Sequence, residues 1–240
     1  MQLLSKRVRN MTCGRGFSVL YSDIGPQYYR KNGGWKTFDA FDLVMTASRM
    51  FNDFEASVPV TLQRAKDCIE RDVRILRHSF SSRADSDTRT IQMIPQWGEL
   101  EWAHLRGQHA GRHFNIEVGE VVGAEVSGGS DVEWGYVLWF HEFKESSLTV
   151  LRITEPASDA SLRGLLQAAL NEARRCHLSK VTIWSPSQRL KALTGDPIVT
   201  RNHSLPALLF FGNGPKEENI ESESSTSKIT WLSIEKLGWC

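Results

Sequence analysis

The sequence predicts an α/β protein (α+β in its layering) in which helices pack on a mixed β-sheet. Short apolar runs of strand length recur along the chain, for example at Phe17–Tyr21 and Lys180–Trp184. The segment Leu162–Ala173 instead has its apolar residues at the spacing of an amphipathic helix. Hydrophobic residues make up 40% of the 240 residues. That proportion is sufficient for a core and excludes wholesale disorder.

Composition also limits the class of partner. The chain has 29 basic and 28 acidic side chains, a net charge of +1, so electrostatics gives no reason to expect nucleic acid or an anionic membrane. The longest apolar runs, such as Leu205–Phe211, are much shorter than the roughly 18 residues of a membrane span. No apolar segment follows the basic start, so we predict no signal peptide. Four scattered cysteines without a CxxC pair favour a reduced, cytoplasmic compartment.

The first segment, residues 1–48, is predicted to be a piece of an α/β domain. Met1–Asn10 resembles the last turns of an amphipathic helix, and Phe17–Tyr21 has the composition of a buried strand. Gln27–Lys31 follows a proline and is expected to form a short helix. Trp35–Val44 is expected to form another strand. A strand, helix and strand of this size cannot bury a core without partners. We therefore expect an open sheet edge that favours self-association.

The second segment, residues 49–87, is predicted to be a linker that contains a helix. Val58–Leu62 can form a short strand, and Ala65–His78 has apolar residues on one side of a helix. Ser79–Asp87 is polar and is expected to form an exposed loop.

The third segment, residues 88–240, is predicted to be a second domain with its own mixed sheet. A helix is expected at Gln96–Arg106, and the clearest helix of the chain begins at Ser158 or Asp159 and ends near Arg175. Residues 213–228 are rich in Ser and Glu and are expected to be a flexible insertion. Strands are expected at Thr90–Ile94, Val121–Val126, Trp134–Phe140, Ser146–Ile153, Lys180–Trp184, Leu205–Phe211 and Thr230–Ile234.

The histidines are weak candidates for a metal site or for acid–base chemistry. His109 and His113 are four residues apart, as zinc ligands on a helix are. However, Gly107 and Gly111 make a long helix doubtful and no third ligand is evident, so a solvated turn is favoured and no metal is predicted. His104 and His141 are more often surface or packing residues than general bases.

Tyr28 and Tyr29 are the more interesting candidates. A tyrosine in a short helix that follows a buried strand can project into a cleft and donate a proton to a leaving thiolate. The alternative is an aromatic ring packed beneath the helix. The tryptophans of the second domain, such as Trp134 and Trp184, could likewise line an amine pocket, although core packing is favoured for each.

Three blocks of the sequence carry a resemblance to a known family. Residues Phe17–Trp35, with FSVLYSDIGPQYYRKNGGW, resemble the closing half of a GNAT-type N-acetyltransferase domain. In particular they are similar to the fungal lysine N6-acetyltransferase family, whose pattern there is close to SxLYSDIGxxFYxxxGW. Asn202–Leu208 and the terminal Glu235–Cys240 resemble the C-terminal, GNAT-like domain of the same family.

The resemblance implies a reaction and a role for each tyrosine. Such enzymes transfer acetyl from acetyl-CoA, the cosubstrate, to the side-chain amine of free lysine, without a metal. The neutral amine attacks directly, and a motif tyrosine protonates the departing sulfur. Tyr29 matches that catalytic tyrosine, and Tyr28 occupies the preceding aromatic, substrate-binding position. Gly33 and Gly34 place one extra residue before Trp35 compared with the pattern.

The resemblance also identifies what the sequence does not contain. The family holds the CoA diphosphate with an R/QxxGxG/A loop at a helix N-terminus, and no such motif occurs here. Between Ile153 and Leu162 there is no glycine, and two acidic residues would repel a diphosphate. We therefore expect a shortened family member, with little activity of its own and a cofactor-free second domain. The alternative is a non-catalytic binding or scaffold protein.

Overall fold

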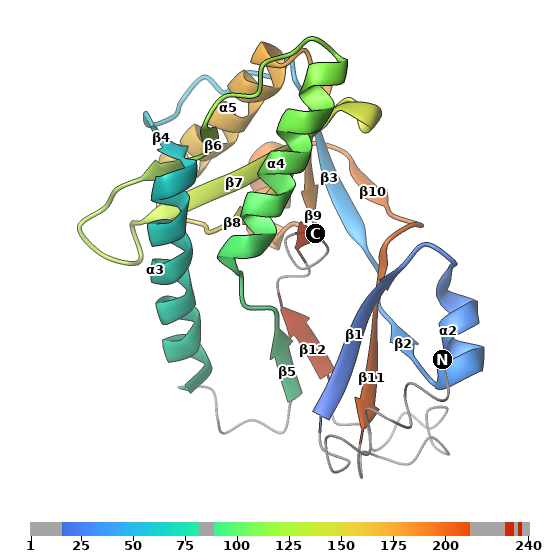
Figure 1. Ribbon diagram of the computed structural model, residues 1–240. Coiled ribbons are helices and arrows are strands. Elements are labelled where there is room, and N and C mark those ends of the chain that lie inside the picture. Colours follow the sequence, from blue (N-terminus) through green and yellow to red (C-terminus); the bar gives the residue numbers. More distant parts are fainter. Residues whose placement is uncertain (1–15, 82–88, 212–228, 233–234, 237–240) are drawn as a thin grey trace. The chain divides into compact units, whose positions relative to one another are not determined.

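The computed structural model describes residues 16–81, 89–211, 229–232 and 235–236 (Figure 1). It has the mixed α/β fold that the sequence predicts, with helices and one mixed sheet of seven strands. The helix end expected at residues 1–10 and the insertion expected at 213–228 lie outside the described residues. Among the helices of the described residues, none is long and apolar enough to cross a membrane.

The chain forms two compact units from discontinuous segments. The first unit draws on residues 1–41, 87–91 and 200–231, and the second on 42–86, 92–199 and 232–240. Segments far apart in the sequence therefore share a unit. The predicted linker 49–87 contributes a strand and a helix to the second unit.

The first unit contains a three-stranded antiparallel sheet and one helix. The sheet order is β1-β11-β2, and β11 pairs with β1 along its whole length. The elements are β1 (Gly16–Ser22), α2 (Pro26–Gly33), β2 (Lys36–Thr37) and β11 (Leu205–Phe211). A separate two-stranded sheet joins β5 (Arg89–Gln92) to β12 (Ile229–Leu232).

The strand predicted at Trp35–Val44 is wrong as one element. The structure divides it into β2 and β3 (Phe41–Thr46), which belong to different sheets. At the break, the backbone N–H of Phe38 donates to Pro206 in β11, and the N–H of Arg201 donates to Ala40. These bonds mark the place where the chain leaves the first sheet.

The second unit is built on the seven-stranded sheet, with order β10-β3-β9-β8-β7-β6-β4. The strand pairs with a known register are antiparallel except β8 with β9. These two strands run parallel, and the chain connects them through helix α5. Its strands are β4 (Val58–Thr61), β6 (Val121–Val126), β7 (Gly135–Glu142), β8 (Ser147–Ile153), β9 (Lys180–Trp184) and β10 (Ile198–Thr200); its helices are α3 (Leu62–Ser81), α4 (Trp97–His113), α5 (Asp159–Arg175) and α6 (Gln188–Thr194).

Two cores cover the two faces of this sheet. On one face, α5 packs its apolar stripe, including Leu162, Leu166 and Leu170, against β6, β7, β8 and β9. On the other face, α3 and α4 pack Ile69 and Leu100 against residues such as Tyr136. The predicted start of α5 is confirmed, because the Ser158 hydroxyl accepts a hydrogen bond from the Ser161 N–H at 3.2 Å.

Helix α4 continues beyond the predicted end at Arg106, through two glycines, to His113. A Cβ atom at Gly107 would lie 3.7 Å from His141 of β7, and one at Gly111 would come within 2.7 Å of the Ile116 carbonyl oxygen. Glycine normally costs helical stability, but here it allows close approach of the neighbouring backbone and the strand. The prediction of a solvated turn at His109 and His113 is therefore wrong.

The two sheets exchange strands in a reciprocal way. Along the chain, β1, α2 and β2 precede β3, while β9, α6 and β10 precede β11. Strand β11 lies between β1 and β2, and strand β3 lies between β9 and β10. Each pair of strands joined through a helix therefore encloses the strand that follows the other pair in the chain.

Candidate functional site

The two predicted tyrosines lie in α2, directly after β1. Tyr28 is 45% exposed, whereas Tyr29 is half-buried against a small apolar cluster that includes Trp35, Ala207 and Leu209. The rings of Tyr28 and Tyr29 pack edge to face, with their centres 5.2 Å apart. The rings of Tyr29 and Trp35 pack in the same way, with their centres 6.3 Å apart. Helix α2 starts at Pro26 and ends where Gly34 adopts a left-handed conformation. The structure thus brings Tyr29 together with the tryptophan that the motif places after it.

The reciprocal arrangement allows α2 to be compared with α6 of the second unit. The N–H of Gly34 donates to the Arg30 carbonyl, and the N–H of Gly195 donates to the Lys191 carbonyl, each with a left-handed glycine. Counting back from these glycines, the position of Tyr29 corresponds to Leu190. Leu190 is buried and carries no hydroxyl group. The second unit therefore has no phenol at the equivalent place.

The second unit has an opening between its two parallel strands. The pairing of β8 with β9 runs from Ser147 and Lys180 to Val150 and Ile183, although β8 itself continues to Ile153. Beyond this pairing lies a pocket of about 190 Å³. In open α/β sheets, ligands bind at the carboxyl ends of strands. The pocket is lined by Ile153, Glu155, Ile183, Trp184, Ser185, Pro186, Ser187, Leu190 and Glu235.

A buried ion-pair network anchors the carboxyl-terminal segment in this opening. One guanidinium nitrogen of Arg152 donates to both carboxylate oxygens of Glu235, at 2.9 and 2.8 Å. The other nitrogens of Arg152 donate to Asp72 of α3 at 2.7 and 3.0 Å. The Tyr136 hydroxyl also donates to Asp72, at 2.8 Å. Next to Glu235, the Lys236 ammonium lies 4.2 Å from the centre of the Trp184 ring. The segment 235–236 is thus held by charge pairing and by a cation–π contact.

The electrostatics of this network favour partial protonation. Burial raises the pKa of Glu235 to about 7, although Arg152 opposes the shift. Burial and the neighbouring Asp72 carboxylate also raise the pKa of Tyr136 well above its usual value. Two carboxyl groups share one guanidinium, so the network holds the segment in place and does not present a free base to a ligand.

The amino end of α5 is also occupied by groups of the protein. Arg189 donates to the carbonyl oxygens of Pro156 and Ala157 at 2.5 and 2.8 Å, and to the Asp159 carboxylate at 2.6 Å. Ser158 caps the helix. Helix amino ends bind anions when their N–H groups are free and acids are absent. Here Ser158 takes the N–H of Ser161, and Asp159 places a carboxylate in the first turn, so this turn is unfavourable for a diphosphate.

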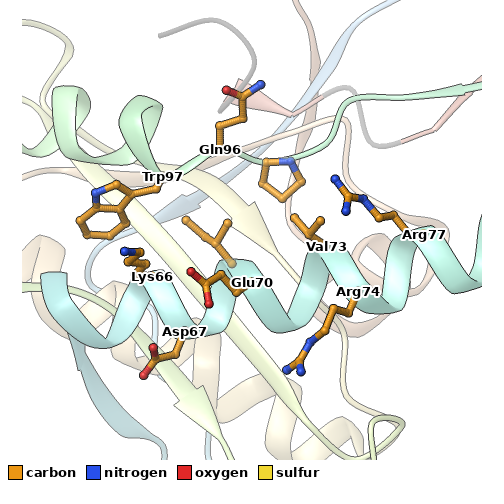
Figure 2. A pocket seen from close by; sticks show the side chains of 10 residues that line it. Lys66, Asp67, Glu70, Val73, Arg74, Arg77, Gln96 and Trp97 are labelled. Carbon is orange, nitrogen blue, oxygen red and sulfur yellow. The ribbon is translucent and has the colours of Figure 1, made fainter.

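A wider surface groove of about 640 Å³ runs along α3 and the start of α4 (Figure 2). Lys66, Glu70 and Arg77 of α3 lie on the same side as Trp97, whereas Asp67 and Arg74 point away (Figure 2). The charged side chains that line it are exposed and of both signs. Exposed charges of both signs are typical of a solvated helix face and do not by themselves assign a ligand.

His141 is buried, and its side chain is engaged in an internal hydrogen bond. Its Nε2 atom lies 2.7 Å from Glu172, whose two carboxylate oxygens also accept hydrogen bonds from Arg175 at 2.8 Å each. Despite burial, Arg175 and His141 lower the pKa of Glu172 to about 2. The Cys176 sulfur lies 3.5 Å from the same carboxylate, and burial raises its pKa to about 12. A protonated thiol and an arginine-bound carboxylate are poor metal ligands.

His109 and His113 are neighbours on the exposed side of α4. Their rings meet edge to face at 5.1 Å. In the part of the chain that the structure describes, no third histidine, cysteine or carboxylate joins them. His104 lies earlier in the same helix and is buried, and its burial lowers its pKa.

The buried network of Arg152, Asp72 and Glu235 was not foreseen from the sequence. Arg152 lies in the middle of the apolar run TVLRI, which is the one available signal, because a charge inside a buried strand needs a partner. Its partners are 80 and 83 residues away along the chain. Spacing rules that operate over one turn of helix or one strand cannot find them.

Comparison with known proteins gives a family and a fold. Residues 46–240 match the model of a family described as the LYC1 GNAT-like C-terminal domain. No curated protein matches the chain. A GCN5-related N-acetyltransferase from Anabaena variabilis ATCC 29413 is similar at 14% identity and a TM-score of 0.48. A conserved protein of unknown function from Enterococcus faecalis V583, described as a probable N-acyltransferase, is similar at 11% identity and a TM-score of 0.52.

Both structural matches cover 87% of this chain but only 49% and 48% of the respective neighbours. The chain therefore spans about half the length of the solved structures that it matches. At these identities the likeness shows the fold alone.

Proposed function

The chain belongs to the family of the LYC1 GNAT-like C-terminal domain, and from this premise we propose that it serves acetyl transfer from acetyl-CoA to an amine, with free lysine as the acceptor. The family match covers residues 46–240, and the motif around Tyr28 and Tyr29 lies just before it. Acetyl-CoA is the cosubstrate that GNAT acetyltransferases use in general, and no metal takes part in the proposal.

In this proposal the chemistry belongs to the first unit. The neutral amine attacks the thioester carbonyl carbon, a carbon–nitrogen bond forms and the carbon–sulfur bond breaks. The nitrogen loses one proton to water as the amide forms, and water returns one proton to the tyrosine after the transfer. The Tyr29 hydroxyl gives its proton to the departing thiolate, and Tyr28 borders the acceptor. The position of Tyr29 in α2 supports this role, because it is half-buried at the start of a helix that follows the carboxyl end of β1.

The observation that carries this division of roles is the β8–β9 opening of the second unit, which the protein's own side chains already occupy. The unit's helix start is capped by Ser158 and carries the Asp159 carboxylate, its strand opening holds Glu235 and Lys236, and Leu190 stands at the position equivalent to Tyr29. A GNAT-like fold with these features offers no site for the coenzyme. We therefore propose that the second unit is non-catalytic.

Calorimetric titration with acetyl-CoA tests this division. We expect no low-micromolar binding to the purified chain, since the second unit offers no fixed donors to a diphosphate. An Arg189→Ser variant, which removes the guanidinium beside the turn before α5, is the matched control and should also fail to bind because Glu155 and Asp159 remain. Low-micromolar binding that Arg189→Ser weakens would place the coenzyme in the second unit and contradict the proposal.

The alternative function is a non-catalytic binding or scaffold protein. The occupied β8–β9 opening of the second unit is compatible with it as well. Mass spectrometry of a mixture of the chain, lysine and acetyl-CoA separates the two. Acetyl-lysine that forms with the wild-type chain and not with Tyr29→Phe supports the transferase. Lysine binding without any product supports the binding protein.

Self-association through an open sheet edge stays a prediction. Among the described residues β1 is the outer strand of the order β1-β11-β2. Light scattering over a range of concentrations checks it, and a monodisperse monomer at high concentration would contradict it.

A further inference from the structure

The segment that follows β3 is held on α5 by two side chains of that helix. Arg174 donates to the carbonyl oxygens of Ala47 and Arg49, at 3.1 and 3.2 Å. Gln167 accepts from the Phe51 N–H at 2.9 Å. The chain between these contacts therefore lies beside the helix.

The same segment, which leads to β4, then crosses α5 in direct backbone contact. A Cβ atom at Gly164 would come within 2.0 Å of the Glu55 carbonyl oxygen. The N–H of Glu55 also donates to the Ala160 carbonyl oxygen at 3.1 Å. The residues between β3 and this crossing are thus fixed to the helix on both sides.

The sulfur of Met50, in the middle of this segment, lies beside the same two side chains. The Arg174 guanidinium donates to the sulfur with a nitrogen–sulfur distance of 2.9 Å, and the Gln167 amide does so at 3.6 Å. Met50 is nevertheless 58% exposed. A thioether is only a weak acceptor of hydrogen bonds. Two donors, one of them charged, therefore surround an exposed sulfur that accepts poorly from both.

Exposure distinguishes Met50 from the other methionines that the structure describes. Met45 in β3 is fully buried in the core under α5, and Met93 is half-buried. Oxidation of a sulfur side chain depends on access of the oxidant. Met50 is the most accessible of these three residues.

We propose that Met50 is a site of oxidation to methionine sulfoxide, whose oxygen accepts the hydrogen bonds of Arg174 and Gln167. The oxidant is a peroxide. The sulfur lone pair attacks one peroxide oxygen, a sulfur–oxygen bond forms and the oxygen–oxygen bond breaks. Sulfur loses two electrons, and the other oxygen leaves as hydroxide. The proton of the transferred oxygen passes to this hydroxide, which becomes water.

The modification strengthens the contact between the segment and α5. A sulfoxide oxygen is polar, and a hydrogen bond from a guanidinium to such an oxygen is stronger than one to a thioether. Methionine has three rotatable side-chain bonds, so the new oxygen can turn toward the donors. Sulfoxide formation disrupts a packed core, but Met50 lies at the surface. The site belongs to the second unit and does not depend on the proposed acetyl transfer.

Oxidation of the whole chain with dilute hydrogen peroxide tests the proposal. Peptide mass spectrometry should show one added oxygen on Met50 before Met93 or Met45 is oxidised. The oxidised chain should unfold at a temperature about 2–4 °C higher than the untreated chain, the shift that one hydrogen bond gives in a chain of this length. Reduction by the two methionine sulfoxide reductases, with a dithiol as the electron source, should reverse the shift.

Three variants assign the shift to this contact. Met50→Leu keeps an apolar side chain without sulfur, so peroxide should leave its unfolding temperature unchanged. Met93→Leu is the matched control and should respond as the wild type does. Arg174→Leu removes the charged donor and should lose most of the rise. Each variant is compared with its own untreated form, so a change in its starting stability does not enter the result.

Four outcomes would overturn the proposal. The first is that Met45 or Met93 is oxidised before Met50. The second is an unfolding temperature of the oxidised wild type that is unchanged or lower. The third and fourth are that Met50→Leu or Arg174→Leu gains as much from peroxide as the wild type.

Discussion

At the scale of single residues, Arg152 connects three elements through its partners. Its side chain is 5% exposed and is bound to Asp72 of α3 and to Glu235 of the carboxyl-terminal segment. Removing one member of a buried charged network leaves the others unpaired, which costs more than the loss of an exposed pair.

We predict that Arg152→Ala lowers the free energy of unfolding by about 3–5 kcal/mol, because two buried carboxylates lose their partner. The matched control is Asp131→Ala, since Asp131, the partner of Arg71, is 61% exposed. That variant should cost less than about 1 kcal/mol. Urea unfolding followed by circular dichroism measures both. Equal losses of unfolding free energy in the two variants would show that the buried network of Arg152 does not contribute more than an exposed ion pair.

The second prediction concerns Glu235 and the pH dependence of stability. Its pKa is raised from 4.5 to about 7 in the folded protein, so between these values the folded state binds more protons than the unfolded state. The contribution of Glu235 to stability is therefore present below pH 4.5 and is lost as the pH rises through 7. Over this range the wild type should lose up to about 3 kcal/mol relative to Glu235→Gln. Unfolding free energies of both proteins at pH 5, 6 and 7 give the difference, and parallel pH profiles would refute the shift.

The sequence predicted some of these residues and not others. Tyr28 and Tyr29 were identified from a local motif, and their place in one short helix, with Trp35 just after its end, follows from their nearness in the sequence. Arg152, Asp72 and Glu235 could not be identified in this way, because burial of a charge depends on which distant segments meet. Periodicity describes which face of an element is apolar, but it does not say which elements face each other.

At the scale of elements, α5 is the clearest case of agreement between sequence and structure. Its apolar stripe, its Ser158 cap and its end near Arg175 were all predicted and are confirmed. For α4 the end was wrong, since glycines at 107 and 111 read as helix breakers. In the structure they allow contact with His141 and with the Ile116 carbonyl. Tertiary contact therefore outweighs the intrinsic cost of glycine in a helix, which is about 1 kcal/mol.

The crossing of α5 by the segment before β4 gives a prediction at this scale. Gly164→Ala should destabilise the protein by several kcal/mol, because the added Cβ would lie 2.0 Å from the Glu55 backbone oxygen and neither can move freely. The matched control is Gly98→Ala in α4, where nothing lies within 4 Å. There the higher helix propensity of alanine should stabilise by about 0.5–1 kcal/mol. Thermal unfolding of both variants measures the contrast, and similar behaviour of the two would show that the crossing is not tight.

At the scale of the whole molecule, the reciprocal exchange of β3 and β11 decides which residues fold together. Each of these strands was predicted, wholly or in part, from its apolar residues. Their exchange was not predicted, because pairing between segments as far apart as Leu43 and Ile183, or Ser22 and Leu205, leaves no local pattern. The mixed α/β class could be predicted from composition and periodicity, but the strand order could not.

Two shortened chains test the exchange. Residues 41–240 keep β3, whereas residues 47–240 lack it; both lack β1, α2 and β2. Leu43 and Met45 of β3 are fully buried in the core under α5. We therefore expect the first fragment to unfold cooperatively with native-like helical circular dichroism. The second should lose that cooperativity, because β9 and β10 then lack the strand between them. Identical unfolding curves would mean that β3 is dispensable.

The same exchange has a practical consequence for dividing the gene product. A single break anywhere from Thr46 to Lys180 leaves β1 and β2 on one piece and their shared neighbour β11 on the other, while β3 is parted from β9 and β10. Neither piece carries a full set of strands for its sheet, yet each carries what the other needs. Such pieces are expected to be unfolded apart and to reassemble when mixed, which makes the protein a natural starting point for a split reporter.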